Sequence, residues 1–202
     1  MEKKTWSMLE NSPDVMNQMA AKLGLSPELQ FYDIYSLDEP EQLAHIPRPA
    51  LALLVIIPLT PAWDRSRKAE DANTEPYTGS GPDEPVICDA IPLDMTHRAE
   101  MLCNSEPFEL AHKSVEQAGD SCADPTDGRS GGHFVGFVKS GGKLWELEGS
   151  RKGPLERGSL ADDEDVLSPR ALDMGIRRII QLDKDGEVES LRFSCIALAR
   201  KL

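Results

Sequence analysis

A histidine and a glutamate in the C-terminal half of the chain have the types and the spacing of two members of a hydrolase triad. His133 heads the apolar run HFVGFV, and Glu148 ends the alternating run KLWELE that follows it. Gly141-Gly142 between the runs predicts a hairpin, which brings both side chains to one end of neighbouring antiparallel strands. There an imidazole can act as general base and a carboxylate can orient it. A histidine at a strand start is also often structural, so the pair alone leaves both interpretations open.

A thiol nucleophile for this pair has few candidates. None of the cysteines forms a CxxC pair, so neither a metal site nor a cofactor is predicted. Asp89 raises the thiol pKa of its neighbour Cys88, which disfavours that residue as the nucleophile. The apolar run around Cys195 predicts a packed small side chain. The four cysteines are Cys88, Cys103, Cys122 and Cys195.

The elements that must position these residues predict a fold of the α/β (α+β) class. Helical and alternating patterns succeed one another without an internal repeat, which favours a single domain with a central, mostly antiparallel sheet flanked by helices. Helices are predicted over 12–25, 39–46 and 168–182, with two more in 92–120 broken at Pro107; strands are predicted over 30–37, 50–57, 133–140, 143–149 and 191–200.

Three segments stand out from this pattern. The run ALALLVII at 50–57 is apolar throughout, which is typical of a strand buried on both faces. Residues 61–86 are polar and contain proline and glycine, so they are predicted to be a surface linker with at most one helical turn. Residues 119–132 have the composition of a loop.

Composition and charge exclude several classes of partner. The 202 residues are 40% hydrophobic and 28% charged, with a formal net charge of −13. An acidic surface repels nucleic acids and anionic membranes, and it favours a basic partner or serves solubility alone. The longest apolar run, at 50–59, is too short to span a bilayer, and the N-terminus has no signal-peptide pattern. A cytoplasmic, monomeric protein with free thiols is therefore expected.

Longer stretches of the sequence resemble one family of cysteine proteases. WSMLENSPDVMNQMAAKLGL, FYDIYSLDEPEQLAHIPRPALALLVIIPLT, HFVGFV with LWELEGSRKGPLERG, and PRALDMGIRRII resemble the ubiquitin carboxyl-terminal hydrolases (the UCH family), in the same order and over most of the chain. The resemblance implies one UCH-like domain over 1–202 with a papain-related fold. It also implies thiol-dependent hydrolysis at the C-terminal glycine of ubiquitin and ubiquitin as the partner.

The resemblance also implies roles for individual residues. His133 takes the place of the general base, and Glu148 stands where the family usually has an aspartate. Because a glutamate is one methylene longer, the orienting hydrogen bond is expected to be displaced. Glu10 and Asp33 match acidic residues that contact ubiquitin, and the alternative is that both are solvated surface charges. Residues 119–132 correspond to a crossover loop above the active-site entrance.

One departure from the family concerns the nucleophile. The family carries a run like KQTIxNACG, in which the glutamine contributes to the oxyanion hole and the cysteine opens a buried helix. Here Ile87 is followed directly by CDAIPLDM, which resembles text downstream of that helix. The resemblance thus implies a segment missing at 87/88. Three hypotheses follow: a catalytically impaired hydrolase, a non-catalytic ubiquitin-binding module, and an unstable product of a mis-spliced gene model.

Overall fold

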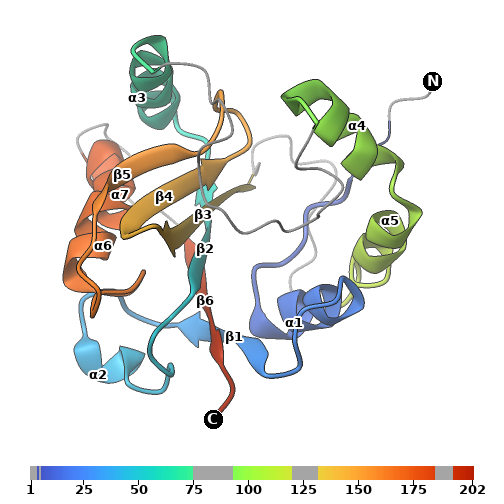
Figure 1. Cartoon of the computed structure of the whole chain (residues 1–202), viewed down its shortest axis with the longest axis horizontal. Coiled ribbons are helices and arrows are strands. Elements are labelled where there is room, and N and C mark those ends of the chain that lie inside the picture. Colours follow the sequence, from blue (N-terminus) through green and yellow to red (C-terminus); the bar gives the residue numbers. More distant parts are fainter. Residues whose placement is uncertain (1–3, 5, 75–92, 120–131, 185–192) are drawn as a thin grey trace.

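Six strands form one antiparallel sheet in the part of the chain that the structure describes (Figure 1). The structure is a computed structural model that describes residues 4, 6–74, 93–119, 132–184 and 193–202. The sheet order is β1-β6-β2-β3-β4-β5. The strands are β1 (Leu29–Ile34), β2 (Ala52–Pro58), β3 (Gly132–Ser140), β4 (Lys143–Glu148), β5 (Leu155–Ser159) and β6 (Ser194–Arg200).

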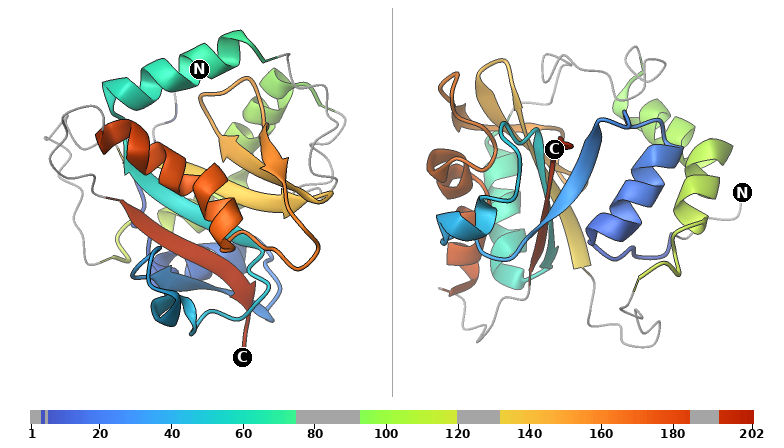
Figure 2. Two further views of the ribbon diagram at one scale, coloured as in Figure 1. Left: turned by 90° about the vertical axis from the view of Figure 1, so that its left-hand side faces the viewer. Right: turned by 90° about the horizontal axis from the view of Figure 1, so that it is seen from below.

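Helices pack against both faces of this sheet (Figure 2). On one face lie α6 and α7, with α3 in contact with α7; on the other lie α1, α4 and α5. The predicted α/β architecture with an antiparallel sheet is therefore confirmed. The helices are α1 (Pro13–Lys22), α2 (Pro40–Leu43), α3 (Pro61–Ala72), α4 (Met95–Asn104), α5 (Glu106–Lys113), α6 (Pro169–Met174) and α7 (Ile176–Lys184).

The β3–β4 hairpin forms as its glycines predict. Gly141 and Gly142 have φ values of 57° and 69°, and Ser140 pairs with Lys143 across the turn. Two consecutive positive φ values are what a two-residue hairpin turn requires, and glycine adopts them without steric penalty. The turn fixes the register that brings the far ends of the two strands together.

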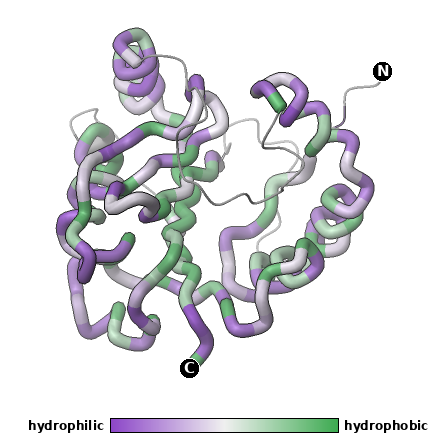
Figure 3. Tube along the Cα trace, in the orientation of Figure 1, coloured by the Kyte–Doolittle hydropathy of each residue, from purple (hydrophilic) through white to green (hydrophobic). Residues whose placement is uncertain are grey.

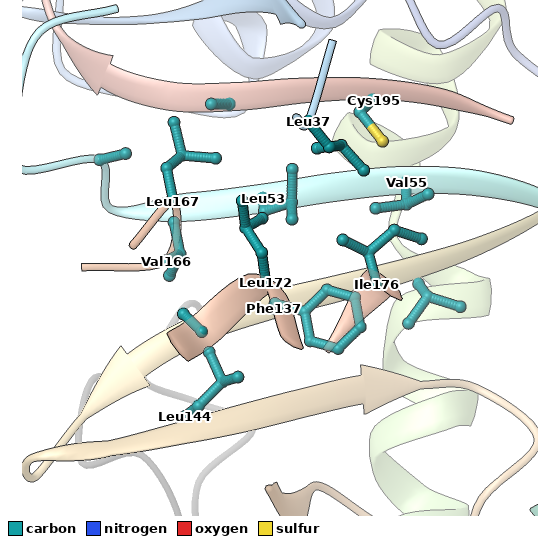
Figure 4. Close-up of a cluster of buried hydrophobic side chains, with 14 of the residues drawn as sticks. Leu37, Leu53, Val55, Phe137, Leu144, Val166, Leu167, Leu172, Ile176 and Cys195 are labelled. Carbon is teal, nitrogen blue, oxygen red and sulfur yellow. The ribbon is translucent and has the colours of Figure 1, made fainter. Parts of the chain in front are cut away.

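The two faces of the sheet differ in how well they are covered. A large apolar cluster lies under α6, α7 and α3, and includes Leu53, Phe137 and Ile176 (Figure 4). The opposite cluster is much smaller and consists of Leu9, Val15, Met16, Val115 and Ile196. In Figure 3 the central strands are nonetheless hydrophobic along much of their length.

Two predictions about 50–86 are wrong. The strand in 50–57 is buried on one face only: Leu53, Val55 and Ile57 are buried, whereas the alternate residues of β2 are half-buried. The predicted linker begins with the three-turn helix α3, because Thr60 caps it and Pro61 occupies its first turn. Residues 75–86, the 87/88 junction and nearly all of the predicted loop at 119–132 lie outside the described residues.

No helix in the described part of the chain is long and apolar enough to cross a membrane.

Candidate functional site

His133 and Glu148 form a direct hydrogen bond at the open end of the β3–β4 hairpin. Glu148 pairs in register with Val135, and His133 lies two residues further along β3. The imidazole Nε2 donates to Glu148 Oε1, and the side chains are 19% and 0% exposed. Since Nε2 is occupied, Nδ1 is the nitrogen of the neutral ring that can accept a proton. The structure thus brings the two predicted residues together.

The environment of Glu148 keeps its carboxylate charged. Burial raises the pKa of Glu148, but hydrogen bonds from His133 and from the Ser150 backbone outweigh it, so that the pKa lies below its usual value. The Ser150 N–H donates to Oε1 at 2.8 Å, while Oε2 is buried without a partner among the described residues. The longer glutamate therefore reaches His133, and its second oxygen is left unsatisfied.

Helix α3 contacts His133 directly and Glu148 only through the loop at Ser150. The ring of Trp63, 3% exposed, lies tilted against the His133 ring with centroids 5.3 Å apart. Arg67 lies one turn further along α3, 5.7 Å from the centre of the Trp63 ring, and donates to the Ser150 carbonyl at 2.7 Å. Neither residue was predicted as part of the site, because both lie in the segment predicted to be a linker. The available signal was the Thr-Pro start of the helix with Trp and Arg four residues apart.

A buried ion cluster fastens α3 to the hairpin. Glu146, which is fully buried, accepts hydrogen bonds from Arg151 and Arg157, each at 2.7 Å. Glu70 of α3 binds Arg151, Arg157 and Arg178. Burial raises the pKa of Glu70, but these arginines outweigh it and bring the value to about 2. The cluster joins segments far apart in the sequence, so no local pattern indicated it.

Glu10 and Asp33 line one acidic cavity of about 460 Å³. Asp14 in the first turn of α1 lines it too, with Ser12 and Gln117 among the other lining residues. Burial and the negative charges of Asp14 and Glu10 raise the pKa of Asp33 against the opposing effect of His45. Three carboxylates around one cavity create a negative potential suited to a cationic ligand.

The described cysteines do not complete a triad. Cys195 in β6 is buried opposite Val55, and burial raises its pKa to about 12. Cys103 lies on α4, and the described contacts of the His133 ring are with Glu148 and Trp63. Cys88 and Cys122 lie outside the described residues. Within the described ranges, no group of three or more His, Cys, Asp or Glu side chains is arranged to hold a metal ion.

The sequence is similar to one family of known proteins. The sequence model of "Ubiquitin carboxyl-terminal hydrolase, family 1" matches residues 6–88 and 84–181. The chain is similar to ubiquitin carboxyl-terminal hydrolase 3 of Arabidopsis thaliana, with 29% identity over an alignment of 234 positions that covers 98% of the chain and 95% of the relative. A ubiquitin carboxyl-terminal hydrolase of Aplysia californica is 27% identical over 78% of the chain and 88% of that protein.

A solved structure has the same fold. The catalytic domain of Trichinella spiralis UCH37, bound to ubiquitin vinyl methyl ester, superposes with a TM-score of 0.69. The superposition covers 98% of this chain and 97% of that one, at 20% sequence identity.

Proposed function

Because this chain belongs to ubiquitin carboxyl-terminal hydrolase family 1, we propose that it binds the C-terminal tail of ubiquitin and that its own hydrolytic turnover is impaired. The observation that carries the proposal is the intact His133–Glu148 pair without a thiol nucleophile beside it among the described residues. In thiol-dependent hydrolysis the imidazole takes the proton of the attacking thiol and returns it to the leaving group. His133 can hold that proton at Nδ1 while Glu148 orients the ring.

The lengths of the alignments support the loss of a segment. The family match divides into two stretches that meet at 84–88, between α3 and α4. The alignment with the Arabidopsis relative has 234 positions, more than the 202 residues of this chain, so the relative has residues that this chain lacks. A loss at 87/88 removes the run in which the family places its cysteine and its oxyanion glutamine. Losing one oxyanion donor typically lowers a rate by about 10²–10³-fold.

The acidic cavity supports ubiquitin as the ligand. The tail of ubiquitin is basic and ends in glycines, so that a carboxylate-lined cavity can bind its arginines by charge-assisted hydrogen bonds. Glu10, Asp14 and Asp33 supply the carboxylates. The similar UCH37 structure is bound to ubiquitin vinyl methyl ester. If hydrolysis is wholly absent, the same cavity makes the chain a non-catalytic ubiquitin-binding module.

Ubiquitin carrying a vinyl methyl ester at its C-terminus tests both halves of the proposal. We expect reversible binding that weakens as salt screens the cavity, and no specific covalent adduct by mass mapping. An adduct on Cys88 that disappears in His133→Ala would show that the site is active and that impairment is wrong. Absence of binding at low salt would exclude the ubiquitin-binding part. Adducts spread over several cysteines and unaffected by His133→Ala indicate exposed thiols only, and therefore agree with impairment.

A further inference from the structure

An apolar groove lies on the less covered face of the sheet. Its volume is about 460 Å³, and Leu54 of β2 and Phe134 of β3 contribute to its lining. Met16 and Met19 of α1 line it as well, and the segment before α1 contributes Trp6 and Met8, which are 37% and 36% exposed. Aromatic and methionine side chains left this open on a protein surface are typical of an interaction site.

The sequence itself indicates that this face is suited to being covered. The run at 50–57 has apolar side chains on both faces of the strand, as in a strand packed between two layers. The structure covers only the face of Leu53, Val55 and Ile57 completely. Leu54 belongs to the other face and is half-buried, although it packs against the small apolar cluster beside α1. Among the described residues the groove therefore lacks part of the layer that its strand composition predicts.

We propose that this groove binds the apolar face of an amphipathic helix with a basic polar face, supplied by a partner protein. An extended peptide would need a free strand edge, but β2 pairs with β6 and β3, and β3 pairs with β2 and β4. A helix satisfies its own backbone hydrogen bonds, so it can lie on a sheet whose strands are already paired. Flexible methionine side chains adapt to the surface of such a helix.

His112 of α5 also lines the groove. The residue is 7% exposed and lines the groove, and its Nδ1 is buried without a hydrogen-bond partner among the described residues. The Glu116 carboxylate is 4.0 Å from Nδ1, too far for a hydrogen bond, and the Trp6 ring lies edge-on at 5.0 Å. Because Nδ1 is itself buried, the ring of His112 serves the groove as part of its wall, beside the Trp6 ring.

Charge and chain length support a helix from outside this chain. The net charge of −13 attracts a helix whose polar face is basic. The family match divides at 84–88, between α3 on one side of the sheet and α4 on the other, and the alignment with the Arabidopsis relative has more positions than this chain has residues. In the described ranges no segment covers this face completely, and an external helix would complete the layer. This inference does not depend on the acidic cavity or on ubiquitin binding.

A synthetic peptide tests the inference directly. A fluorescent helix of about 18 residues, with leucines at i, i+3, i+4 and i+7 and lysines elsewhere, is titrated with the full chain by fluorescence anisotropy. A scrambled peptide of the same composition has no apolar face, and a leucine–glutamate helix has the same apolar face with the opposite charge. We expect the leucine–lysine helix to bind at least about tenfold more tightly than either control.

Two neutral variants locate the binding site. Met8→Gln removes apolar contact inside the groove, and we expect it to weaken binding of the leucine–lysine helix by about tenfold. Leu110→Gln changes a 60% exposed residue of α5 outside the groove lining and should leave binding unchanged. Circular dichroism checks that both variants fold, and the NMR signals of the His112 ring should shift on binding. Equal binding of the scrambled or leucine–glutamate peptide, or of Met8→Gln, would refute the proposal.

Discussion

Replacing Arg67 by methionine should release the loop that holds Glu148. The Arg67 side chain is 12% exposed, donates to the Ser150 carbonyl at 2.7 Å and lies 5.7 Å from the centre of the Trp63 ring. A hydrogen bond involving a charged group contributes about 1.5–3 kcal/mol, and a cation–π contact about 0.5–2 kcal/mol. The ion pair with Asp64, whose carboxylate is 40% exposed, adds little.

Part of the stabilisation by Arg67 is offset, because its Nε is buried without a hydrogen-bond partner among the described residues. We therefore expect Arg67→Met to lower the free energy of unfolding by about 2 kcal/mol. Urea denaturation measures this change. The matched control is Lys68→Met: Lys68 is 66% exposed and pairs only with Asp64 in the described structure, so its loss should change stability by less than about 0.5 kcal/mol.

The same variants separate a positioning role from a purely stabilising one. Ser150 donates its N–H to Glu148, and Glu148 accepts from His133, so a displaced loop should change the NMR signals of the His133 ring in folded Arg67→Met. Arg67→Lys retains the charge but cannot form the same planar fork, and should give an intermediate result. If Arg67→Met is as stable as Lys68→Met and its His133 signals are unchanged, the proposed link from α3 to the pair is wrong.

Three further predictions concern the carboxylates of Glu148 and Asp33 and the partly covered face of the sheet. The pKa of Glu148 is lowered in the folded state, so the stabilising contribution of its carboxylate is complete above the usual value of 4.5 and is lost as pH falls through the folded value. Glu148→Gln should remove this part of the acid dependence of the unfolding free energy, measured by denaturation at several pH values. An unchanged pH dependence would contradict the lowered pKa. The pKa of Asp33 is raised, which means that its charged form is unfavourable in the folded state, so Asp33→Asn should raise the free energy of unfolding at neutral pH. The same change removes a carboxylate from the acidic cavity and should weaken ubiquitin binding roughly fivefold; tighter binding would contradict the role of the cavity. Inserting at 87/88 the residues by which the Arabidopsis relative exceeds this chain should raise the melting temperature and reduce binding of a hydrophobic dye. Identical melting would show that the groove side of the sheet is already adequately covered.

Local patterns predicted the elements that are held by local interactions. The hairpin followed from Gly141-Gly142 and two alternating runs, and it was enough to bring His133 close to Glu148. The length of helix α3 was missed because much of its stabilisation is not local: besides ion pairs within the helix, Glu70 and Arg67 bind groups in the hairpin region far along the chain. A polar sequence with few apolar positions gives no helical periodicity when ion pairs hold the helix in place.

The strand at 50–57 shows that burial is harder to predict from the sequence than the presence of a strand. Its apolar run shows that the side chains on both faces of the strand are suited to burial. How far each face is buried depends on the other segments that pack against it. Here the layer over Leu53 and Val55 is complete, and the layer over Leu54 is partial. An all-apolar strand therefore predicts two covering layers, whereas the described residues form one complete layer and part of the second.

The two faces of the sheet separate the His133–Glu148 pair from the apolar groove. His133 and Glu148 are held on the side of the sheet that carries α3, by Trp63, Arg67 and the ion cluster around Glu146. The partly covered groove lies on the opposite side, against α1 and α5. The contacts of the imidazole with Glu148 and Trp63 involve none of the residues that line the groove. The geometry of the pair and the covering of the groove should therefore respond to different substitutions, Arg67→Met changing the former and Met8→Gln the latter.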